Sequence, residues 1–121
     1  MKGEFAAIVI AAFCLLASSA GLTALPQDTV HTVVIEGMKF VPDKITVARG
    51  DTVVWINKDF FPHSVTATGG RFDSHEIEAA KAWKYVPKKE GEFGYLCSLH
   101  PTMKGTLVVK QTGSGSDRSG R

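Results

Sequence analysis

Short apolar runs rich in β-branched residues alternate with turn residues through the middle of the chain. Each run has five or six residues, and several place apolar side chains at every second position, which is typical of β-strands. Seven such runs predict an all-β domain, an antiparallel sandwich or barrel of seven to eight strands. The runs are VHTVVI (30–35), KITVA (44–48), TVVWIN (52–57), SVTAT (64–68), KAWKYV (81–86), EFGYLC (92–97) and GTLVVK (105–110).

The segments between the runs refine this prediction. Gly50, in the stretch ARGD, predicts a hairpin between the second and third runs, because glycine readily adopts positive φ. The segment 31–40 is long enough to contain two strands, and DSHEIEAA (73–80) is the one candidate for a helical turn. In the run 92–97, the period of two places Cys97 on the same inward face as its aromatic residues. Cys97 therefore points inward where the chain leaves the sheet.

The N-terminal segment predicts export. Residues 5–25 carry no charge and are rich in Ala, Ile, Val and Leu, so residues 1–20 are interpreted as a signal peptide cleaved after Ala20. An uncleaved membrane anchor is the alternative, because about 20 apolar residues can cross a bilayer. We expect a linker at 21–29, one domain at 30–111 and a flexible tail at 112–121, with the protein in the periplasm or outside the cell.

Composition removes several function classes. The net charge is +2 and the acidic and basic residues are mixed, so neither nucleic acid nor an anionic membrane surface is indicated as a partner. Cleavage would remove Cys14 and leave Cys97 as the only thiol, which excludes an internal disulfide and the paired cysteines of an immunoglobulin-type domain. A lone thiol in an oxidising compartment is explained by metal ligation or by burial as a small apolar residue.

The stretch CSLHPTM (97–103) places Cys97, His100 and Met103 three residues apart. A thiolate, an imidazole and a thioether together favour copper, whereas a structural zinc site prefers four Cys or His ligands. A second imidazole is required, and His63 is the best candidate because FFP holds it on a short apolar loop. His31 is expected at a solvated strand position, and His75 is expected at the surface, although it is the fallback ligand.

The motifs FPHSVT (61–66), YLCSLHPTM (95–103) and KGTLVV (104–109) resemble the cupredoxin family of small blue copper proteins. The spacing Cys-x-x-His-x-x-Met is similar to the short ligand loop of amicyanin-like members. The resemblance implies an eight-stranded Greek-key sandwich with one type 1 copper. It also implies that His63, Cys97 and His100 are equatorial ligands and that Met103 is the axial ligand.

Two positions depart from the family pattern. Ser64 stands where members commonly carry an Asn that hydrogen-bonds to the Cys-containing loop, and we expect the Ser hydroxyl to do part of that work. Leu99 stands where amicyanin-like members have proline, and we hypothesise that its N–H donates to the Cys97 sulfur. Met38 is expected to fill the core.

These ligands favour electron transfer over catalysis, because they leave no coordination position for a substrate. We expect a monomer that meets redox partner proteins transiently at an apolar patch near His100, Phe61 and Pro101. A copper chaperone or storage protein with the same ligands is the main alternative. A thiol enzyme with Cys97 as nucleophile is a further alternative, but it gives Met103 no role.

Overall fold

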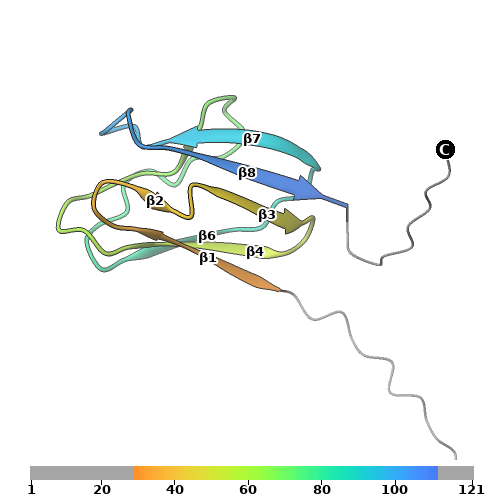
Figure 1. The fold of residues 1–121 in the computed structure, drawn as a ribbon, viewed down its shortest axis with the longest axis horizontal. Coiled ribbons are helices and arrows are strands. Elements are labelled where there is room, and N and C mark those ends of the chain that lie inside the picture. The colour runs from red at the N-terminus through yellow and green to blue at the C-terminus, as the bar shows by residue number, and fades with distance from the viewer. Residues whose placement is uncertain (1–28, 112–121) are drawn as a thin grey trace, which may run out of the picture.

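The computed structural model describes residues 29–111 and shows two four-stranded β-sheets that form a sandwich (Figure 1). One sheet has the strand order β2-β1-β4-β6 and the other β3-β8-β7-β5. The all-β class predicted from the sequence is confirmed. The strands are β1 (Val30–Ile35), β2 (Phe40–Val41), β3 (Lys44–Ala48), β4 (Thr52–Asn57), β5 (Thr66–Ala67), β6 (Ala82–Tyr85), β7 (Gly91–Leu96) and β8 (Lys104–Lys110).

The described range leaves out both ends of the chain. The predicted signal peptide, nearly all of the predicted linker and the predicted tail lie outside residues 29–111. Within that range there is no helix, and thus no helical segment of the length and apolarity that crossing a bilayer requires.

The pairing of the strands differs from the predicted antiparallel arrangement. β1 pairs with β4 and β3 pairs with β8 in parallel, whereas the other four pairings are antiparallel. Period-two patterns identify a strand and its buried face but do not encode the direction of its neighbour. The expectation of an antiparallel domain was therefore wrong for two of six pairings.

The turn at Gly50 is not the predicted hairpin. Gly50 has the expected positive φ, 94°, and the Asp51 N–H donates to the Ala48 carbonyl at 3.0 Å. However, β3 and β4 belong to different sheets, so this turn carries the chain across the sandwich. Turn residues specify a reversal of the chain, and the partner of the following strand is set by the core.

The core lies between the two sheets and includes a cluster of aromatic rings. Trp55 of β4 and Tyr95 of β7 are fully buried and meet edge to face, with ring centroids 5.6 Å apart. Gly105 of β8 pairs with Tyr95, and a Cβ at this glycine would overlap the tyrosine ring. The packing of the Tyr95 ring therefore requires glycine at position 105. The core also contains Val33, Ile35, Phe40, Val47, Val53, Val65, Phe72, Leu107 and Val109.

The segment 73–80 does not form the predicted helical turn. Its polar side chains bind backbone N–H groups instead: Asp73 Oδ1 accepts from the His75 N–H at 2.9 Å, and Ser74 Oγ accepts from the Val65 N–H at 2.7 Å. Such local side-chain bonds compete with helix formation. The segment instead makes isolated bridges, Asp73 with Thr66 and Ile77 with His63.

Candidate metal centre

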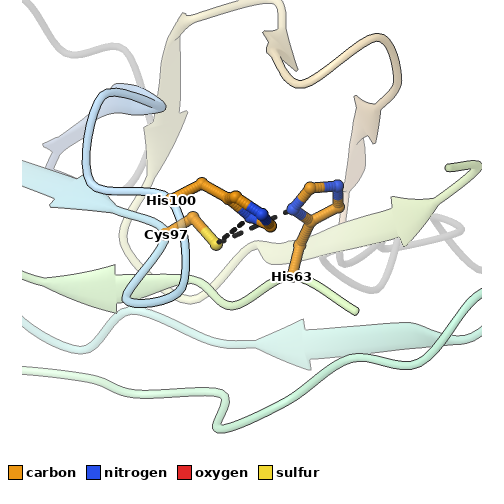
Figure 2. Close-up of side chains that lie close together, drawn as sticks. All are labelled: His63, Cys97 and His100. Carbon is orange, nitrogen blue, oxygen red and sulfur yellow. Dashed lines mark hydrogen bonds between the residues drawn. The ribbon is translucent and has the colours of Figure 1, made fainter. Parts of the chain in front are cut away.

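Three potential metal ligands converge at one end of the sandwich. The Cys97 sulfur lies 3.7 Å from Nδ1 of His63 and 3.7 Å from Nδ1 of His100, and the three donor atoms all lie within 4.8 Å of one another. Figure 2 shows the three side chains pointing toward a common point, with Cys97 and His100 coming from the loop after β7. His63 and Cys97 are completely buried, whereas His100 is partly exposed.

The loop between β7 and β8 links its three key residues through the backbone. The His100 N–H donates to the Cys97 carbonyl at 3.2 Å, and the Met103 N–H donates to the His100 carbonyl at 2.9 Å. The Cys97 N–H in turn donates to the Met103 carbonyl at 3.1 Å, which closes the ring. The three-residue spacing seen in the sequence is thus the spacing of two consecutive turns. Met103 is buried at the end of this loop, with 3% of its surface exposed.

His63 is held by segments that are distant in the sequence. Its backbone forms a bridge with Ile77, through N–H to carbonyl bonds of 3.1 and 2.6 Å. The buried Asn57 at the end of β4 donates from Nδ2 to the carbonyls of Phe61 at 2.7 Å and Ile77 at 2.9 Å. This amide therefore ties both sides of the His63 segment to the first sheet.

The carboxylate of Asp59 fixes the orientation and tautomer of the His63 ring. His63 Nε2 lies 2.9 Å from Asp59 Oδ2. Burial tends to raise the pKa of Asp59, but hydrogen bonds from the Met38 and Gly37 N–H groups and from His63 outweigh burial and lower it. Because an ionised carboxylate only accepts, Nε2 carries a proton, and in the neutral ring the lone pair of Nδ1 faces Cys97.

Asp59 was missed in the sequence analysis. Its signal was its position four residues before His63 and two residues after Asn57. A carboxylate that orients a ligand histidine is a common partner in metal sites.

The hydrogen bond to the Cys97 sulfur comes from a different residue than predicted. The Ser64 N–H donates to Sγ at 3.3 Å, and the structure shows no bond from the Leu99 N–H to this sulfur among the described residues. The hypothesis about Leu99 was therefore wrong. Ser64 follows His63 directly, so the bridge that places His63 also brings its neighbour's N–H to Cys97.

The expected role of the Ser64 hydroxyl is confirmed. Ser64 Oγ accepts from the Ser98 N–H at 2.7 Å and lies 2.9 Å from Ser98 Oγ. The side chain of Ser64 thus connects the His63 segment to the loop after Cys97, as an amide at this position would.

The remaining histidines and Met38 lie away from the three donors. His75 is at the surface as expected, with 88% of its side chain exposed. His31 is only partly exposed because its Nε2 lies 2.8 Å from Asp51 Oδ2, so the expectation of a solvated position was only partly right. Met38 is 40% exposed and its φ is positive, so its expected place in the core was wrong.

Known proteins resemble this chain in both sequence and structure. A model of the cupredoxin-like domain matches residues 5–109. The chain belongs to the cupredoxin-like family. It is 31% identical over 91 residues to amicyanin from Paracoccus versutus, covering 71% of this chain and 68% of that protein. It is also 30% identical over 89 residues to plastocyanin from Scenedesmus fuscus, covering 59% of this chain and 86% of that protein.

Solved structures agree with this membership of the cupredoxin-like family. The oxidised state of a proline-to-alanine mutant of amicyanin superposes with a TM-score of 0.65 at 30% identity, covering 69% of this chain and 85% of that one. A Cu-containing nitrite reductase from Thermus scotoductus has a TM-score of 0.63 at 26% identity, but the match covers only 22% of that enzyme. The similarity to the enzyme therefore concerns one part of it.

The donor set fits the copper ion predicted from the sequence. One thiol and two imidazole Nδ1 atoms form a compact group, which is the ligand chemistry that a cupredoxin copper requires. The completely buried sulfur also disfavours the thiol-enzyme alternative, because a substrate cannot reach it without displacing the surrounding side chains.

Proposed function

We propose that this chain is an exported electron carrier that holds one type 1 copper ion through His63, Cys97, His100 and Met103. The observation that carries this proposal is the convergence of the Cys97 sulfur with the Nδ1 atoms of both histidines. Copper, when bound, supplies a one-electron couple between Cu(I) and Cu(II).

The residues of the chain prepare the site for rapid electron transfer. Asp59 and Ile77 hold His63 in place, and the backbone ring of the β7–β8 loop holds the other ligands. Such a constrained site changes little in geometry between oxidation states. Burial of His63 and Cys97 excludes water from the sulfur, whereas partly exposed His100 offers the shortest path from the surface.

Apolar side chains flank the ligands His63 and His100 in the sequence, and we propose that they form a docking face. We define it by Phe60, Phe61, Leu99, His100 and Pro101. Phe60 is 94% exposed, Phe61 60% and Leu99 42%. Exposed apolar patches often mark protein interaction sites, and redox encounters use small, weak interfaces. A redox partner protein would dock transiently on this face, with the carrier acting as a monomer.

Export to the periplasm is supported by the uncharged segment 5–25 and by the single thiol of the domain. Mass determination of the protein recovered from the exported fraction tests this assignment. A chain that begins after Ala20 is expected, and a chain that retains residues 1–20 would favour the membrane anchor.

Addition of Cu(II) to the purified protein tests the function. An intense blue absorption band is expected, with loss of the band in Cys97→Ala and His63→Ala and its retention in the control His75→Ala. An intact band in either of the first two variants would contradict the proposal. A pale complex whose copper passes readily to a chelator would favour copper delivery or storage instead.

A further inference from the structure

A chain of three side-chain hydroxyls runs from the β7–β8 loop to an exposed carboxylate. Ser98 Oγ lies 2.9 Å from Ser64 Oγ, which lies 2.9 Å from Thr66 Oγ1. Thr66 Oγ1 donates to Asp73 Oδ1 at 3.1 Å. Ser64 is completely buried, and Asp73 keeps 45% of its side chain exposed. The chain therefore connects the surface to the residue that donates to the Cys97 sulfur.

The carboxylate determines the direction of every bond in this chain. The backbone N–H of His75 and the hydroxyl of Thr66 lower the pKa of Asp73, so the group is ionised at neutral pH and only accepts. Each hydroxyl has one proton to donate. Thr66 uses its proton on Asp73, so Ser64 must donate to Thr66, and Ser98 must donate to Ser64.

This order of donors and acceptors strengthens the hydrogen bonds between Ser64 and the β7–β8 loop. A hydroxyl that donates its proton becomes a better acceptor, so hydrogen bonds arranged in series reinforce one another. Ser64 Oγ then accepts both the O–H and the N–H of Ser98, the latter at 2.7 Å. A well-held Ser64 in turn keeps its own N–H on the Cys97 sulfur at 3.3 Å.

We propose that Asp73 and Thr66 are remote positioning residues of the metal centre, which orient the Ser64 hydroxyl and so fasten the loop that carries Cys97 and His100. The side-chain hydrogen bonds of these two residues do not involve the Cys97 sulfur or the ring nitrogens of His63 and His100. The proposal rests on the proposed function for its effect on copper, but the hydrogen-bond chain itself belongs to the metal-free protein.

Amide hydrogen exchange of the metal-free protein tests the series of hydrogen bonds from Ser98 to Asp73 directly. Thr66→Val and Asp73→Ala each remove one link, and we expect exchange of the Ser98 N–H to become about threefold to tenfold faster in both. Asp73→Asn retains an acceptor oxygen and should exchange within twofold of the wild type. Thr68→Val is the control: it removes a nearby hydroxyl that donates to the Gly94 carbonyl and takes no part in the series from Ser98 to Asp73. It should leave the exchange rate of the Ser98 N–H unchanged. Wild-type exchange at Ser98 in both Thr66→Val and Asp73→Ala would overturn the proposal.

The reduction potential of the copper-loaded protein tests the link to the metal centre. An N–H donor withdraws electron density from the sulfur, so a loosened Ser64 should lower the potential. We expect a lower potential in Thr66→Val and Asp73→Ala and the wild-type value in Asp73→Asn. Unchanged potentials in the first two variants would overturn the positioning role. Failure of the proposed function would look different, because wild-type protein would then show no blue band while the metal-free exchange data remained valid.

Discussion

The two segments that supply the metal ligands are held in place by different means. The loop that carries Cys97, His100 and Met103 closes on itself through three backbone hydrogen bonds. The segment that carries His63 depends on contacts with Asn57, at the end of β4, and with Ile77, 14 positions after His63. One ligand group is therefore specified locally, and the other depends on the whole sandwich.

Removal of the Asn57 side chain should cause the largest loss of stability. Asn57→Ala leaves the carbonyls of Phe61 and Ile77 without their amide donor, and the Asp59 N–H loses its acceptor. We expect the free energy of unfolding of the metal-free protein to fall by about 3 kcal/mol. Urea unfolding measures this loss, with Thr46→Val on the exposed face of β3 as a control. A loss below about 1 kcal/mol would mean that the His63 segment is held mainly by other contacts.

The same contrast explains how much of the site could be predicted from the sequence. Cys97, His100 and Met103 form a contiguous motif, so their proximity was evident before the fold was known. His63 was identified because an apolar loop and a resemblance marked it, but nothing in the local pattern places Asp59 against its ring. The donor to the Cys97 sulfur was assigned to nearby Leu99, whereas the structure uses Ser64, 33 positions away.

The fold shows a similar limit. The runs at 30–35, 44–48 and 52–57 coincide with β1, β3 and β4 because each is a short run rich in β-branched residues that is bounded by turn residues. The two-residue strand β2 is too short to form such a pattern. The sheet to which β3 belongs depends on its parallel partner β8, about 60 residues further along the chain, and local turn chemistry at Gly50 does not encode that partner.

Tyr95 lies in β7, the strand that leads into the ligand loop, and it should make the stability of the protein depend on pH in the alkaline range. Burial raises the pKa of Tyr95 from 10.0 to about 12, although the Trp55 indole partly offsets this effect. The folded state therefore favours the neutral phenol. Its contribution to stability is complete below pH 10 and is lost as the pH rises through 12, a difference of about 2 to 3 kcal/mol.

Urea unfolding of the wild type and Tyr95→Phe between pH 8 and pH 12 measures this difference. The wild type should lose more stability than the variant over this interval, because Phe has no proton to lose. The hydroxyl has no hydrogen-bond partner among the described residues, so the variant should fold normally at neutral pH. Parallel stability curves for the two proteins would show that the phenol titrates as it does in the unfolded chain.

Asp59→Asn should weaken the hydrogen bonding that holds the His63 ring and leave the β7–β8 loop intact. One of the two carboxylate oxygens becomes an NH₂ group, which cannot accept from both backbone N–H groups and from His63 at once. We expect copper affinity to fall about tenfold to a hundredfold, as for other partners of ligand histidines. Competition with a chelator measures the affinity, and nitrogen NMR of the metal-free His63 ring should show mixed tautomers. Unchanged affinity with an unchanged tautomer would remove Asp59 from the site.

A charge on the docking face should change electron transfer but hardly affect stability. Phe61 is 60% exposed, and Asn57 contacts only its backbone carbonyl among the hydrogen bonds described, so Phe61→Lys should alter the free energy of unfolding by less than about 0.5 kcal/mol. Electron self-exchange between oxidised and reduced copies, measured by NMR line broadening, brings two docking faces together without any foreign partner. Two facing lysines repel, so we expect exchange to slow about tenfold at low salt and to recover partly at high salt. Thr46→Lys adds the same charge on β3 and should slow exchange much less. Equal slowing in both variants would show that net charge, rather than the face around His100, governs the encounter.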